Sequence, residues 1–167
     1  LRAVASRGGR SVAAAPREDT DQSLLEWSAA LLRLQLLPDL KAIFRLTFLG
    51  DAVLALAVSS HLYPLLAEYG VGRLTKVRAQ AVSGAACAEV ALDLGVPERL
   101  REQAPEGDER GFESLLASER VLSSVTEAVI GAVYLGLGYD RVADPVVAAF
   151  ARQIDEVTGL STLVVVD

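Results

Sequence analysis

The sequence predicts an all-α domain, and three observations favour that class. Apolar residues recur at helical spacing along most of the chain. Two long segments, 40–62 and 112–136, are almost continuously apolar, as in buried central helices. β-like sequence is confined to 163–166. With 167 residues, of which 51% are hydrophobic and 23% charged, the chain suits one domain with a substantial core and excludes a fully disordered protein.

The individual helices follow from caps and breakers. Thr20 or Asp21 caps a helix to about residue 37, which Trp27 is expected to anchor to the core. Pro64 is expected to interrupt the central segment that begins at residue 40. Shorter helices are predicted over 73–83 and 84–95. The polar segment 96–111 is predicted to be a loop with at most one helical turn, over 98–101. Further helices are predicted over 112–136 and 144–157, the last beginning at Asp144 and Pro145.

Basic and acidic residues are distributed unevenly along the chain. Residues 1–18 are expected to form a flexible basic arm, 19–158 the domain and 159–167 a tail. The first 17 residues hold four arginines and no acid, which is typical of a transit-peptide remnant or of a disordered arm. The rest holds 12 basic and 22 acidic residues, a formal charge of −10, which argues against binding nucleic acid through overall charge alone.

The chain has few residues suited to a disulfide or a zinc site. The single cysteine, Cys87, and the single histidine, His61, exclude an internal disulfide and a zinc cluster, and both are expected to be packing residues. No stretch of 18 apolar residues runs without a charge or breaker, so no transmembrane helix and no membrane partner are expected.

Two carboxylates interrupt the two most apolar segments. Asp51 lies in FRLTFLGDAVL and Glu127 in SSVTEAVIGAVYLG. Small neighbours such as Gly50 and Gly131 would let the two helices approach closely, so that Asp51 and Glu127 face each other and bind Mg²⁺. In the simpler interpretation, Asp51 bonds Arg45 or a backbone amide and Glu127 pairs with Arg120.

These segments resemble the ribonuclease III family. FRLTFLGDAVL is similar to the family signature ERLEFLGDAVL, and VLSSVTEAVIGAVYLG to its second acidic helix, ILADAFEALIGAIYLD. LTKVRAQAVS, between them, matches a family helix close to LxxLRA. The resemblance covers about 40–155. It implies an all-α domain that dimerises around a groove for double-stranded RNA, with Mg²⁺ held by acids of the two helices.

The resemblance also shows which acids are missing. The family's two glutamates before Asp51 are replaced by Phe44 and Thr47, and the aspartate before Glu127 by Ser124. A Glu-Gly-Asp run elsewhere is Val71-Gly72-Arg73 here. Phe44 would also desolvate the place of the metal. The resemblance therefore implies a degenerate site, and no double-stranded-RNA-binding domain is expected after residue 158.

Resemblance to a short subclass, Mini-RNase III, keeps catalytic activity of this chain as an alternative. It also keeps only the aspartate and the glutamate, and VSGAACAEVAL (82–92) looks like its VSAKxQAEIL segment. Asp51 and Glu127 would then be the catalytic metal ligands. The acid-rich segment 101–119 counts against this, because the subclass has a basic loop there.

Two surfaces are candidates for partners. The resemblance places Arg73, Lys76 and Arg78 on the RNA-facing helix, although a solvated amphipathic face explains them equally well. Tyr63, Tyr69 and the leucine-rich surface of the signature helix are expected to form a dimer interface.

The favoured expectation is a non-catalytic structural or assembly component of a mitochondrial ribonucleoprotein in the matrix. The large ribosomal subunit fits best, with rRNA and ribosomal or assembly proteins as partners, and no cofactor. One alternative is an active Mg²⁺-dependent endoribonuclease of Mini-RNase III type. Another is a non-catalytic dimer partner in an RNA-processing or RNA-editing complex.

Overall fold

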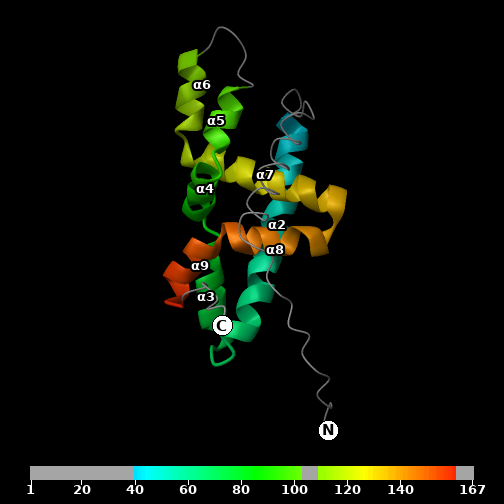
Figure 1. Ribbon diagram of the computed structural model, residues 1–167, viewed down its shortest axis with the longest axis vertical. Coiled ribbons are helices and arrows are strands. Elements are labelled where there is room, and N and C mark those ends of the chain that lie inside the picture. Colours follow the sequence, from blue (N-terminus) through cyan, green and yellow to red (C-terminus); the bar gives the residue numbers. More distant parts are fainter. Residues whose placement is uncertain (1–39, 103–108, 161–167) are drawn as a thin grey trace, which may run out of the picture.

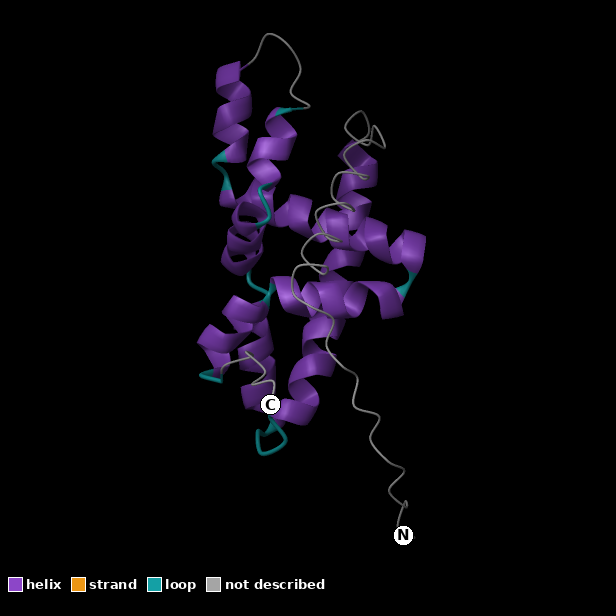
Figure 2. Ribbon diagram, in the orientation of Figure 1, coloured by secondary structure: helices purple, strands orange, loops and turns teal. Residues whose placement is uncertain are grey.

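The computed structural model describes residues 40–102 and 109–160, and this part is helical without a strand (Figures 1 and 2). The all-α prediction is confirmed. The arm, the helix predicted over 20–37 with Trp27, and residues 161–167 lie outside the described residues. The helices are α2 (Leu40–Leu65), α3 (Val71–Ala81), α4 (Gly84–Asp93), α5 (Val96–Arg101), α6 (Glu109–Leu116), α7 (Glu119–Leu137), α8 (Tyr139–Ala149) and α9 (Ala151–Thr158).

Helix α2 is the axis of the molecule. In Figure 1 it runs along the long direction, and α7 and α8 cross it. Its core-facing side carries Leu54, Val58 and Leu62, which are buried almost completely. These side chains pack with Phe150 and Ile154 from the C-terminal helices in one apolar cluster. Burial of this surface is the main stabilising contribution to the arrangement.

Several predicted boundaries are wrong. Pro64 lies within the last turn of α2, which ends one residue later at Leu65, so the proline marks the end of this helix. The expected loop 96–111 contains α5 and the start of α6. The expected helix 112–136 is two helices, separated at Ala117 and Ser118.

The C-terminal region also differs from the prediction. Instead of one helix over 144–157, α8 begins at Tyr139 and α9 ends at Thr158, with a break at Phe150. Pro145 lies inside α8 rather than at its start. Phe150 is 1% exposed, so the chain turns at the point where this ring enters the core.

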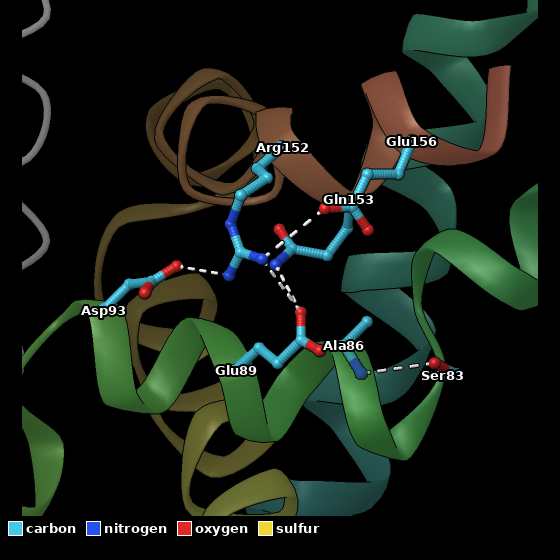
Figure 3. A network of polar contacts seen from close by, with 7 residues as sticks. All are labelled: Ser83, Ala86, Glu89, Asp93, Arg152, Gln153 and Glu156. Atoms are coloured by element: carbon cyan, nitrogen blue, oxygen red, sulfur yellow. Dashed lines mark hydrogen bonds and ion pairs between the residues drawn. The ribbon is translucent and has the colours of Figure 1, made fainter. Parts of the chain in front are cut away.

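A polar network attaches α9 to α4 (Figure 3). The Arg152 guanidinium donates to Asp93 Oδ2 at 2.7 Å and to Glu89 Oε2 at 3.2 Å. Gln153, which is buried, donates to the same Glu89 oxygen at 3.2 Å. Because the ion pairs are solvent-exposed, they fix the orientation of α9 more than they stabilise the fold.

The two residues expected to be packing residues differ in burial. Cys87 is a free thiol, fully buried in the main core cluster, and its pKa is raised to about 12 chiefly by that burial. His61 is half-buried, and burial lowers its pKa against the opposing charges of Asp155 and Asp144. Both residues lie on the core side of their helices rather than in a metal cluster of the described residues.

Among the described residues, two helices are long and apolar enough to cross a membrane, judged by length and composition alone. They span Phe44–Leu65 and Glu119–Leu137. Core helices of water-soluble proteins meet the same criterion, and here both helices pack against each other and against α8 in the core.

Candidate metal and RNA site

The crossing of α2 and α7 brings the sequence-predicted site positions together. A Cβ atom on Gly50 would overlap the backbone carbonyl of Glu127, and one on Gly131 would overlap the carbonyl of Leu46. The helices therefore touch backbone to backbone, as the small residues predict. Asp51 follows the first of these contacts directly, and Glu127 forms part of it.

The two carboxylates interact through their charges. Asp51 is exposed and Glu127 is half-buried. The pKa of Glu127 is raised, first by burial and then by the charge of Asp51, while the Ser123 hydroxyl opposes the shift. A divalent cation near both groups would relieve this repulsion. Among the described residues neither Asp51 nor Glu127 forms an ion pair, so the expected pairs with Arg45 and Arg120 are absent.

The positions of the missing acids lie at the same crossing. The Thr47 hydroxyl donates to the backbone carbonyl of Ser124 at 3.1 Å, which joins two of these positions across the helix pair. Phe44 is 63% exposed, so this chain alone does not bury it against the carboxylates. The Thr47 hydroxyl thus joins α2 to α7 at a position where the resemblance places a glutamate.

Two hydroxyl residues of α7 were not singled out from the sequence. Ser123 is buried and donates to Glu127 Oε1 at 3.5 Å. Thr126 donates to the backbone carbonyl of Cys87 at 3.0 Å and so attaches α4 to α7. The spacing of four between Ser123 and Glu127 is a signal that could have identified the first contact.

The basic residues belong to α3, which begins after the C-terminal end of α2. Arg73 and Lys76 are exposed, Arg78 is half-buried, and the helix carries no acid. Arg73 lies 3.6 Å above the Tyr69 ring. The basic residues thus lie on a different helix from the two carboxylates.

The exposed face of α2 is an apolar stripe, which we define as Phe44, Phe48, Leu56 and Tyr63. Phe48 is 81% exposed and Tyr63 is 75% exposed. Tyr69 is half-buried beside Arg73, and Leu54 is fully buried. Leu54 of the signature thus faces the core, whereas Phe44, Phe48, Leu56 and Tyr63 are exposed, and the expected dimer interface stays a prediction.

The comparisons agree with this arrangement. The model of the Ribonuclease III domain family matches residues 45–138. The chain belongs to the ribonuclease III family. Ribonuclease 3 of Thermobifida fusca is 37% identical over 120 residues, covering 70% of this chain and 47% of that protein. Ribonuclease 3 of Delftia acidovorans is 43% identical over 95 residues, covering 57% and 40%.

A solved structure shares the fold as well. It is described as showing structural flexibility in a region involved in dimer formation of the nuclease domain of ribonuclease III from Campylobacter jejuni. The TM-score is 0.57 at 29% identity, over 71% of this chain and 77% of that one. The chain spans about half the length, or less, of the curated ribonuclease III relatives it matches.

The ribonuclease III family implies a magnesium ion, and the residues present fit it. No group of three metal-ligating side chains occurs in the described part of the chain, so the candidate donors are the carboxylates of Asp51 and Glu127. Mg²⁺ is commonly bound by one or two carboxylates together with waters and substrate phosphates. Asp51 and Glu127 supply two such carboxylates.

The raised pKa of Glu127 predicts a pH-dependent gain in stability for Glu127→Gln. The folded state holds this proton more tightly than the unfolded chain, so ionisation destabilises the fold as pH rises from 4.5 through the raised folded value. Without metal, the variant should exceed the parent in free energy of unfolding at pH 7 and match it near pH 4. Urea unfolding in EDTA measures this, with Glu68→Gln, an exposed glutamate, as control. Equal stability of Glu127→Gln and the parent at pH 7 would contradict it.

Proposed function

We propose that this ribonuclease III domain cleaves double-stranded RNA with a divalent metal held by Asp51 and Glu127. The observation that carries the proposal is the backbone contact at the α2–α7 crossing, which holds an exposed and a half-buried carboxylate close enough for one to raise the pKa of the other. Curated relatives that are 34% and 37% identical to this chain are named Ribonuclease 3, which supports the assignment.

Each part of the chain then has a role. A bound divalent metal would supply Lewis acidity for activating a water and for stabilising the leaving oxygen of the phosphodiester. Asp51 and Glu127 would hold that metal, Asp51 from the exposed side and Glu127 from the helix crossing. Arg73, Lys76 and Arg78 neutralise backbone phosphates at the far end of α2, where the acid-free helix offsets the negative charge of the body.

The purified chain with labelled duplex RNA tests this function. In Mg²⁺ or Mn²⁺ we expect both strands to be cut, whereas single-stranded RNA of the same sequence, duplex DNA and samples with EDTA stay intact. A folded chain that leaves duplex RNA intact in both metals at high protein concentration would refute the proposal.

The apolar stripe of α2 supports assembly as a dimer, in which the stripes of two copies cover each other. Phe48→Asp should raise the dimer dissociation constant by at least about 100-fold, because burial of an unpaired charge in an apolar interface costs several kcal/mol. Light scattering across a concentration series measures the change. Phe48 is 81% exposed in one chain, so folding should persist.

The matched control for the dimer is Leu92→Asp, which adds the same charge at an exposed leucine of α4. It should leave the dissociation constant unchanged. Equal weakening by both variants would place the interface elsewhere.

The replaced acids favour a second function, that of a non-catalytic RNA-binding component. Phe44, Thr47 and Ser124 cannot ligate metal as carboxylates, and Thr47 bonds Ser124 instead. Such a chain would serve in a mitochondrial ribonucleoprotein such as the large ribosomal subunit, or as the dimer partner of a related subunit with all its acids. It would sediment with the particle or partner and tolerate Asp51→Asn. Mitochondrial location depends on the basic arm, outside the described residues, and stays a prediction.

A further inference from the structure

The apolar stripe of α2 is a long surface that the described part of the chain leaves uncovered. Helices α7 and α8 cross α2 and α3 packs against its end, so its other sides are covered (Figure 1). Each of the four side chains of the stripe is more than half exposed, from Phe44 at one end to Tyr63 at the other. Contiguous exposed apolar side chains commonly mark an interaction site, so the stripe calls for an occupant.

The segment that precedes α2 in the sequence has a matching composition. Residues 20–37, outside the described part of the chain, hold Leu25, Ala29, Leu32 and Leu36 at helical spacing. The sequence therefore predicts a helix with an apolar face, which needs a surface to pack against.

The connection between the segment and α2 favours the stripe. The segment is separated from α2, which begins at Leu40, by residues 38 and 39 alone. Two helices joined by so short a link lie antiparallel beside each other. A helix over 20–37 is about 27 Å long, and the distance along α2 from Leu40 to Leu56 is about 24 Å. A segment folded back from this link reaches Phe44, Phe48 and Leu56, and ends before Tyr63.

We infer that residues 20–37 fold back along α2 and cover Phe44, Phe48 and Leu56 in the single chain. The dimer proposed above uses the same surface, so the segment and a second copy compete for it. Because two residues join the segment to the stripe, its effective concentration there is high, and it holds the stripe in dilute protein. The segment therefore sets the protein concentration at which two copies assemble. This inference is independent of RNA cleavage.

Cross-linking of paired cysteines in the full chain tests the position of the segment. Residues 29 and 48 are equally far from the link, so a short bis-maleimide should join Ala29→Cys to Phe48→Cys within one chain. The matched control pairs Ala29→Cys with Leu92→Cys, at an exposed leucine of α4, and should stay unlinked. The native Cys87 thiol is fully buried and does not compete. Mass spectrometry of dilute protein separates links within a chain from links between chains.

Release of the segment should favour the dimer. Leu32→Asp places a charge on the apolar face of the segment, which weakens its contact with the stripe. The dimer dissociation constant should then fall at least about tenfold, because the stripe is free in a larger fraction of the chains. Ser23→Asp adds the same charge on the opposite side of the predicted helix and should leave the constant as in the parent. Sedimentation across a concentration series measures both variants, and circular dichroism checks that they are folded.

Either measurement can overturn the inference. If Ala29→Cys is linked to Phe48→Cys within one chain no more than to Leu92→Cys, the segment does not cover the stripe. If Leu32→Asp and the parent assemble at the same protein concentrations, the segment and the second copy do not compete. Neither test uses RNA, so either failure leaves the proposed cleavage standing.

Discussion

Gly50→Ala is expected to lower the free energy of unfolding by about 3 kcal/mol or more, because its new methyl group would overlap backbone atoms of Glu127. Backbone atoms cannot rotate away as a side chain can, so α2 and α7 must separate along their whole contact. Gly131→Ala meets the Leu46 carbonyl and should have a similar cost. Urea unfolding measures both, and the double variant should cost less than the sum, since one separation accommodates both methyl groups.

Gly136→Ala is the matched control, in the same helix α7 as Gly131. A Cβ atom there meets nothing within 4 Å. Alanine in a helix is more favourable than glycine, so stability should rise by up to about 1 kcal/mol. If Gly50→Ala and Gly136→Ala unfold alike, the close crossing is wrong.

Asp51→Asn and Glu127→Gln should each reduce the cleavage of duplex RNA by about 10³-fold or more, equivalent to about 4 kcal/mol of transition-state stabilisation. Each change preserves shape and removes one of two charged donors, so the remaining carboxylate cannot hold the ion in place. Single-turnover rates in saturating Mg²⁺ measure the loss. Because the two residues act on one ion, the double variant should be little slower than either single variant.

Asp140→Asn removes an exposed carboxylate from α8, away from the crossing, and should cleave at the parental rate. Stability is followed in parallel, since loss of charge repulsion should leave Glu127→Gln folded. Parental cleavage by Asp51→Asn would instead favour the non-catalytic component.

The central helix pair was predictable because its signals are local. Continuous apolar sequence gave the burial of α2 and α7, and Gly50 and Gly131 gave their close approach. The ends of helices were less predictable: the break at Ala117 and Ser118 and the turn at Phe150 depend on where side chains enter the core. Pro145 was expected at the start of a helix, where proline loses no hydrogen bond, but it lies inside α8.

In the site, too, features with a local sequence signal were predictable, and features that depend on long-range contacts were not. The pairing of Asp51 with Glu127 followed from small residues. The bond from Thr47 to Ser124 and the outward direction of Phe48 depend on how α2 is rotated about its own axis. Contacts with α7 and α8, far away in the sequence, set that rotation.

The acid-free helix α3 has a consequence for the approach of RNA. In a chain whose body is strongly negative, three positive side chains without acids on one helix make the molecule an electric dipole. Under the proposed function, we expect the negative body to repel RNA and α3 to attract it, so that encounters begin at α3. The order of contact is thereby built into the charge distribution, and rising ionic strength should slow the arrival of RNA before it alters events at the helix crossing.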